Sequence, residues 1–258
     1  MTNEPEYLYR YRHLENKHRE YTQRILTDSV LYFASPSSFN DPFDCKVHFQ
    51  PTSLSELRKR YEQSMHRLRP DLARAGRRTK ARDDFRQRDL KEVMKKTTGK
   101  TQDSVNKLGV LSLSATDKNI LLWSHYAAGH TGLCLRFSGI SNSSFFGRAQ
   151  QVKYSVGYPK VSVGVGPFNS TDVEALLFTK AKAWDYEQEW RIIDNKKGFG
   201  EKRFPPELLT GVILGARMSQ EDRDEVLRWI EKRNRPVEIC EAVVSSNSFS
   251  LNIVPYER

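Results

Sequence analysis

The excess positive charge of this chain is confined to residues 58–100. That segment holds 16 lysines and arginines against 6 acidic residues, so its net charge of +10 equals that of the whole 258-residue chain. Its sparse apolar residues recur at spacings that suit one or two helices, with breaks expected near Pro70 and Gly76. So thin an apolar stripe cannot build a core, and we expect a basic helical insertion at about 54–106.

A cationic helical segment suits a polyanion, because Lys and Arg that neutralise phosphates release condensed counterions. We therefore expect nucleic acid to bind through residues 58–100. Two other interpretations stay open: solvated helices that keep the protein soluble, and a docking surface for an acidic protein.

The rest of the composition excludes several classes of protein. The 13 Phe, 11 Tyr and 4 Trp are too many for a disordered chain. No stretch approaches the roughly 18 apolar residues of a membrane span, and the N-terminus lacks the apolar segment of a secretory signal. The three cysteines, Cys45, Cys134 and Cys240, fit neither a disulfide framework nor a zinc site. We expect a cytoplasmic protein without a membrane partner.

Short alternating segments outside the insertion predict strands, and amphipathic segments predict helices between them. Strands are expected at 7–14, 30–36, 108–116, 131–137, 151–158, 187–193, 211–215 and 237–244. Helices are expected at 19–28, 119–129 and 171–184, and again after Ser219. Without repeats or linkers, this order predicts one α+β domain over residues 1–258 that carries the basic insertion.

The strongest local pattern is WDYEQEWRII. On a strand, Glu187, Glu189 and Arg191 would share one face, with the two carboxylates about 7 Å apart. Such a pair suits proton transfer or the stabilisation of a cationic transition state. The alternative is a solvated strand face with one ion pair.

Other candidate residues lie in three further segments, and each has a structural interpretation as well. Arg10 and Arg12 lie on the first strand, and Asn40, Asp41 and Asp44 lie in the turn FNDPFD. Ser114 ends a strand, and the helix that follows carries Trp123, His125 and Tyr126. The chain lacks GxGxxG after a strand, GxxxxGK[ST], GxSxG and HExxH, which counts against the enzyme classes that these motifs mark.

The segments LYRYR, LYFASPSSFNDPFD, LSLSATDKNILLWSHYAAGHTGLCLRF and KAKAWDYEQEWRII occur in this order. Together they closely resemble a bacterial domain family of unknown function that is marked by FNDPF, WSHYA and E-x-EWR motifs. The order of elements also resembles the ADP-ribosyltransferase superfamily. That resemblance implies split, curved mixed β-sheets with flanking helices, and NAD held in the cleft between the sheets.

The resemblance also implies a set of site residues. The first motif falls on Arg10 or Arg12, the middle motif on Ser112 to Ser114 with Tyr126 or alternatively on Tyr32, and the glutamate on Glu189. We expect catalytic roles for Glu189, Glu187 and Arg12. Contacts with NAD are expected from Arg10, Tyr9, Asn40, Asp41, Ser114, Trp123, His125 and Tyr126.

The function implied is NAD-dependent ADP-ribosyl transfer, with NAD as substrate and no metal. We expect an intracellular toxin or phage-defence effector that modifies RNA or DNA and is neutralised by an antitoxin protein. One alternative is a catalytically inactive module that binds nucleic acid or a partner. Another is a nuclease that holds Mg²⁺ with Asp41, Asp44, Glu187 and Glu189.

Overall fold

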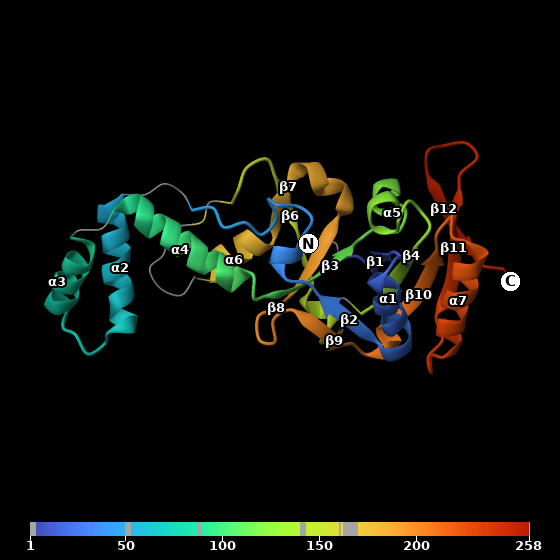
Figure 1. Ribbon diagram of the computed structural model, residues 1–258, viewed down its shortest axis with the longest axis horizontal. Coiled ribbons are helices and arrows are strands. Elements are labelled where there is room, and N and C mark those ends of the chain that lie inside the picture. The colour runs from blue at the N-terminus through green and yellow to red at the C-terminus, as the bar shows by residue number, and fades with distance from the viewer. Residues whose placement is uncertain are drawn as a thin grey trace. The chain divides into compact units, whose positions relative to one another are not determined.

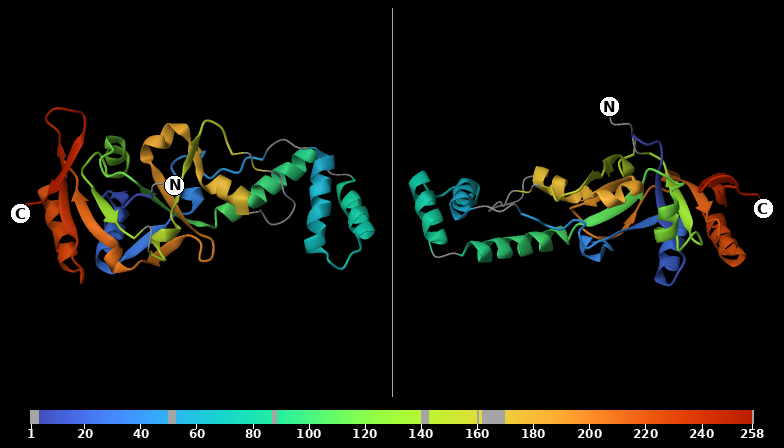
Figure 2. Two further views of the ribbon diagram at one scale, coloured as in Figure 1. Left: turned by 180° about the vertical axis from the view of Figure 1, so that it is seen from behind. Right: turned by 90° about the horizontal axis from the view of Figure 1, so that it is seen from above.

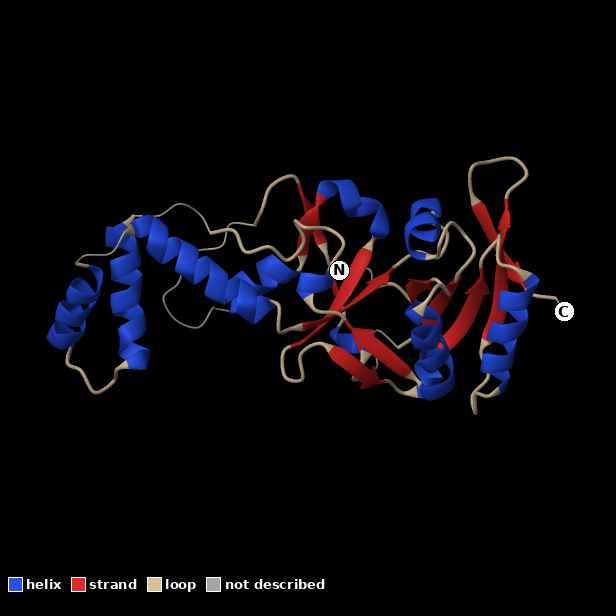
Figure 3. Cartoon of the chain, viewed as in Figure 1, coloured by secondary structure: helices blue, strands red, loops and turns tan. Residues whose placement is uncertain are grey.

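The computed structural model describes residues 4–49, 53–86, 89–139, 143–159, 161 and 170–257. Within them the chain is mixed α+β, which confirms the expected class (Figures 1 and 3). The chain divides into two compact units. The first comprises Met1–Ser38, Leu108–Val152 and Ala183–Arg258, and the second comprises Phe39–Lys107 and Lys153–Lys182.

Eight strands of the described chain form one sheet in the first unit, in the order β12-β11-β10-β4-β1-β3-β8-β5. Their bounds are β1 (Leu8–Arg12), β3 (Gly109–Ser114), β4 (Leu133–Phe137), β5 (Gln150–Gln151), β8 (Glu189–Asp194), β10 (Leu209–Leu214), β11 (Glu238–Val244) and β12 (Leu251–Pro255). Strand β10 runs parallel to β11, and the other neighbours are antiparallel. A separate antiparallel pair joins β2 (Val30–Phe33) to β9 (Gly200–Arg203).

The two faces of this sheet have different cores. On one face, α1 (Lys17–Asp28), α7 (Gln220–Glu231) and the β2-β9 pair cover a large apolar cluster that includes Leu8 and Trp190. Helices α1 and α7 lie side by side (Figure 2), where Arg19 forms ion pairs with two carboxylates of α7. On the other face, α5 (Ile120–Tyr126) packs over a smaller cluster. The first strand therefore lies between two differently covered surfaces.

The second unit is mainly helical. It contains α2 (Leu54–Leu68), α3 (Arg74–Phe85), α4 (Leu90–Val105), α6 (Ser170–Leu177) and the parallel pair β6 (Lys153–Ser155) and β7 (Thr179–Ala181). The side chains of Ser53 and Asp89 cap α2 and α4 by accepting hydrogen bonds from backbone N–H groups. Helices α2 and α3 pack together, and the Tyr61 hydroxyl donates to Asp84 over 2.9 Å.

The remaining elements of the described chain are 3-10 turns: η1 (Pro36–Ser38), η2 (Phe146–Arg148), η3 (Lys182–Glu187) and η4 (Pro206–Leu208).

The basic insertion forms three described helices rather than one or two. The break at Pro70 is confirmed, but the break expected at Gly76 is wrong, because Gly76 lies in the first turn of α3. The expected helix over 171–184 is also too long. It ends at Leu177, since the next residues pair with β6 as strand β7. Strand β9 was not expected, because its sequence GEKR has no apolar alternation.

Candidate functional site

The E-x-E segment is not one continuous strand. Strand β8 begins at Glu189, Glu187 is the last residue of η3, and the intervening Gln188 has a φ of 44°. The carbonyl of Gln188 accepts a hydrogen bond from the Ala115 N–H over 3.1 Å. The prediction that Glu187 lies on a strand face with Glu189 and Arg191 is therefore wrong. Of the two glutamates, only Glu189 lies on the strand. Glu187 lies before the left-handed residue Gln188, at the end of a 3-10 turn.

Three of the predicted site residues form a row across neighbouring strands. Tyr9 of β1 pairs with Ser114 of β3, and Ser114 pairs with Glu189 of β8. Directly opposed residues of antiparallel strands project to the same face of a sheet. Tyr9, Ser114 and Glu189 therefore share the face that α5 covers.

Hydrogen bonds fix both glutamates on this face. The Tyr126 hydroxyl donates to Oε1 of Glu187 over 2.7 Å, and the Ser114 hydroxyl donates to the Glu187 carbonyl over 2.7 Å. The Arg191 guanidinium binds Glu189 in bidentate fashion, with N···O distances of 2.7 and 2.9 Å. The Glu189 side chain is 4% exposed and that of Arg191 is fully buried. A planar guanidinium leaves little orientational freedom to the carboxylate that it binds in this way.

Asn119 places α5 beside this row, a role that the sequence analysis missed. Its side-chain oxygen caps α5 by accepting from the N–H groups of Leu121 and Leu122, and its amide nitrogen donates to the Tyr186 carbonyl over 3.0 Å. The cap therefore links the helix of Tyr126 to the residue that precedes Glu187. An Asn directly before an apolar run is the signal from which the cap could have been predicted.

Trp123 is a core residue in this structure. It is fully buried, and its indole N–H donates to the Asp117 carbonyl over 2.7 Å. Its ring stands edge to face with Tyr11 and stacks on His130. Trp123 therefore serves the core in this conformation, and its expected contact with NAD stays a prediction. His125, by contrast, is exposed on α5.

Arg10 and Arg12 lie on the opposite face of the sheet from Glu189. They alternate with Tyr9 along β1, and successive strand residues project to opposite faces. Arg10 donates to the Ser112 carbonyl over 2.7 Å, and Nε of Arg12 donates to the hydroxyl of Thr22 on α1 over 3.2 Å. The expectation that Arg12 acts together with Glu189 is therefore wrong, because the two side chains project from opposite faces of the sheet.

The FNDPFD turn belongs to the second unit, where its acidic residues have local partners. Asn40 is exposed, while Asp41 is buried and accepts a hydrogen bond from the Phe43 N–H over 2.9 Å. Asp44 forms a buried ion pair with Lys180 of β7 over 3.7 Å. These contacts match the turn interpretation of the motif.

A search of the described residues finds no group of three or more His, Cys, Asp or Glu side chains that could hold a metal ion. The nuclease hypothesis thus stays a prediction without structural support. In the same part of the chain, no helix is long and apolar enough to cross a membrane. All three cysteines are buried, and within the described residues none of them forms a disulfide.

The basic insertion exposes many cations. Arg60, Arg69, Arg78 and Lys80 form ion pairs with acidic residues of the insertion. Exposed cations outside these pairs occur on all three helices and beside them: Arg58, Lys59, Arg74, Arg82, Arg86, Lys91, Lys95, Lys96 and Lys100. Residues 87 and 88, which include a further arginine, lie outside the described residues.

Comparison of the chain with models of known protein families, with curated proteins and with solved structures finds no match. The geometry of the two faces of the sheet therefore carries the functional argument.

Proposed function

We propose that the chain is an NAD-dependent ADP-ribosyltransferase whose catalytic carboxylate is Glu189. The observation that carries the proposal is the row of Tyr9, Ser114 and Glu189 on adjacent strands, with Tyr126 bonded to Glu187 beside it. The superfamily resemblance implies an N-terminal strand, a middle strand that leads into a helix, and a later strand with the glutamate. Strands β1, β3 and β8 have these features and are neighbours in the sheet. Their adjacency supports the finer fold assignment, an ADP-ribosyltransferase-like sheet.

The chemistry needs a fixed negative charge. When the bond between nicotinamide and ribose breaks, its electron pair leaves with nicotinamide and positive charge develops on the ribose. A carboxylate that is already held in place stabilises that charge without reorganisation. Arg191 orients Glu189 for this role. Glu187 is suited to take the proton from the acceptor as the acceptor bonds to the ribose carbon, and Tyr126 positions it.

Burial imposes a condition on this proposal. Glu187 is 5% exposed and Glu189 is 3% exposed. Both must become accessible before a dinucleotide can reach them, so we expect catalysis to require movement of a covering segment.

The direct test is to incubate the full chain with labelled NAD and with cell extract, RNA or DNA. Glu189→Gln keeps the size of the side chain and removes its charge, and it should lower labelling by about 100-fold or more. The matched control is Glu241→Gln, since Glu241 is also a strand carboxylate paired with an arginine, Arg223. Equal labelling by wild type and Glu189→Gln would remove the assignment.

The proposed acceptor is nucleic acid bound by the basic insertion, as expected of a toxin or phage-defence effector. The exposed lysines of α4 support it, because they gain affinity by displacing counterions. Lys95→Glu with Lys96→Glu should weaken RNA or DNA binding. It should also reduce the slope of the logarithm of the binding constant against the logarithm of the salt concentration by about one for each lost phosphate contact. The matched control is Lys196→Glu with Lys197→Glu, an exposed adjacent pair outside the insertion. A flat salt response of the wild type would exclude nucleic acid. A toxin also implies a neutralising protein, which should copurify with the chain and suppress labelling.

A catalytically inactive binding module is the second candidate. The buried bidentate pair of Glu189 with Arg191 favours it, because such a pair also serves a purely structural purpose. In that case nucleic acid would bind while labelled NAD transferred nothing.

A further inference from the structure

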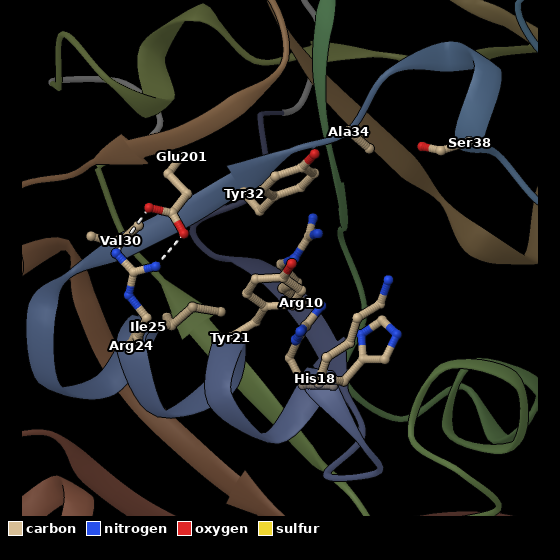
Figure 4. A pocket seen from close by; sticks show the side chains of 12 residues that line it. Arg10, His18, Tyr21, Arg24, Ile25, Val30, Tyr32, Ala34, Ser38 and Glu201 are labelled. Carbon is tan, nitrogen blue, oxygen red and sulfur yellow. Dashed lines mark hydrogen bonds and ion pairs between the residues drawn. The ribbon is translucent and has the colours of Figure 1, made fainter.

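A cavity of about 430 Å³ lies on the α1 side of the sheet in the first unit. Figure 4 shows the side chains that line it, with Arg10 beside Tyr21 and the pair of Arg24 and Glu201 to one side. The lining comes from β1, α1, β2, β9 and the turn after β2. Its two β1 residues, Arg10 and Arg12, project away from the Glu189 face. The cavity is therefore separate from the site proposed for NAD.

The cavity is strongly cationic. Arg10, Arg12, Lys17 and Arg24 line it, and Glu201 is the acidic residue in the lining. Glu201 is already paired with Arg24, with one N···O distance of 2.8 Å. Among the described residues no ion pair joins Arg10, Arg12 or Lys17 to a carboxylate. Three positive charges therefore face the same space without a directly paired carboxylate, and the negative charge of Glu189 acts on Arg10 only through the field.

Burial makes this arrangement costly without an anion. Burial and, to a smaller extent, the positive charge of Arg12 lower the pKa of Arg10 to about 9, against the opposing effect of the negative charge of Glu189. Burial also lowers the pKa of Arg12 to about 10. A desolvated cation is unfavourable unless a negative group compensates it, and guanidinium groups bind phosphate oxygens well.

The cavity also offers flat apolar surfaces. Tyr21 and Tyr32 stack with ring centroids 5.8 Å apart, and Tyr32 remains 38% exposed. Nδ1 of His18, also in the lining, is buried and has no hydrogen-bond partner among the described residues. Cationic groups beside a half-exposed aromatic ring suit a ligand that joins a phosphate to a planar base.

We propose that this cavity is a second ligand site that binds a nucleoside monophosphate, with its phosphate on Arg10 and Arg12 and its base against Tyr32. Glu189 is not in the lining of this cavity, and the proposed ligand is not NAD. The nucleotide site can therefore be tested independently of the proposed transferase activity. Sugar phosphates and inorganic phosphate share the anionic group but lack the base, and the test below separates them.

The test is isothermal titration calorimetry of the full chain with AMP, GMP, ribose 5-phosphate, inorganic phosphate and adenosine. AMP or GMP should bind at least ten-fold more tightly than any of the other three compounds. Equal binding of adenosine would show that the phosphate contributes nothing. Equal binding of ribose 5-phosphate would show that the base contributes nothing. Either result, or the absence of nucleotide binding, overturns the proposal.

Substitutions of lining residues test whether the nucleotide binds in this cavity. Arg12→Gln and the solvent-exposed Lys17→Gln should each weaken nucleotide binding, the former by about ten-fold or more. Tyr32→Leu should weaken nucleotide binding and leave phosphate binding unchanged. The matched control is Arg233→Gln, because burial also lowers the pKa of Arg233 but the residue is outside the lining. Glu189→Gln should bind the nucleotide as the wild type does. Loss of binding in Glu189→Gln with retention in Arg12→Gln and Lys17→Gln would move the ligand to the other face and refute the site.

Discussion

The two faces of the sheet around β1 differ in whether their charged side chains are paired. On the α5 face, the negative charge of Glu189 is matched by the bidentate guanidinium of Arg191. On the α1 face, Arg10 and Arg12 approach a cavity without a carboxylate partner among the described residues. The alternation of Tyr and Arg along β1 therefore supplies two tyrosines to one face and two cations to the other. Removing one partner of a buried pair leaves a costly uncompensated charge, whereas a cation without a paired carboxylate is available to an anionic ligand.

The largest effect should come from breaking the paired side of this comparison. Glu189→Ala leaves the Arg191 guanidinium buried without its bidentate partner and should lower the free energy of unfolding by about 3–5 kcal/mol. Glu241→Ala, which breaks the more exposed pair with Arg223, should cost about 1 kcal/mol or less. Urea unfolding followed by circular dichroism measures both values. A cost for Glu189→Ala no greater than that of the control would show that the buried pair does not hold this face together.

A smaller effect is expected from Tyr126→Phe. The change removes the hydroxyl that donates to Glu187 and should lower the free energy of unfolding by about 1.5 kcal/mol. It should also lower ADP-ribose transfer, because Glu187 would lose part of its orientation. The same unfolding assay and the labelling assay measure the two effects. Unchanged transfer in a folded Tyr126→Phe would remove Tyr126 from the site.

The unpaired side should show the smallest effect at neutral pH. Arg12→Gln loses the bond to Thr22, worth about 1 kcal/mol, but it also relieves a desolvated charge, so the two contributions offset each other. We expect a change in the free energy of unfolding below about 1 kcal/mol at pH 7. A cost of several kcal/mol would show that Arg12 has a structural partner rather than an open anion site.

The pH dependence sharpens this prediction, because burial lowers the pKa of Arg12 from the ordinary value of arginine to about 10. Above about pH 10 the unfolded chain binds more protons at this residue than the folded chain, so folding is favoured as the pH rises. Wild type should therefore gain stability relative to Arg12→Gln between pH 9 and pH 11. Arg10, Lys17, His18, Tyr21, Arg24, Tyr32 and Glu201 also face this cavity. These residues are present in both proteins. The difference between wild type and Arg12→Gln therefore contains less of their contribution to the pH dependence of the free energy of unfolding. A constant difference across this range would contradict the pKa of Arg12.

Much of the fold follows from local sequence patterns, and the site follows only in part. Periodicity was enough to predict the strands around Leu111 and Trp190, because each alternates apolar and polar residues against the core on the α1 side. It also predicted the first strand, where Tyr9 and Tyr11 alternate toward the core on the α5 side. It failed for the E-x-E segment, since a positive φ at Gln188 is invisible to a pattern that assumes regular backbone. The WDYEQEWRII pattern singled out Glu189. The resemblance then gave it a catalytic role, but it also joined Arg12 to the same site although strand alternation separates them. The partners of Glu189 and Lys180 depend on tertiary packing, which no local spacing encodes.

In the proposed arrangement β1 borders two separate sites: Tyr9 shares the face of Glu189 and the transfer site, and Arg12 lines the anion site on the other face. The most direct measurement is transfer of label from NAD by wild type, Glu189→Gln and Arg12→Gln, each confirmed as folded. We expect loss of transfer in Glu189→Gln and transfer near the wild-type level in Arg12→Gln. Loss of transfer in both variants, or in Arg12→Gln alone, would contradict it.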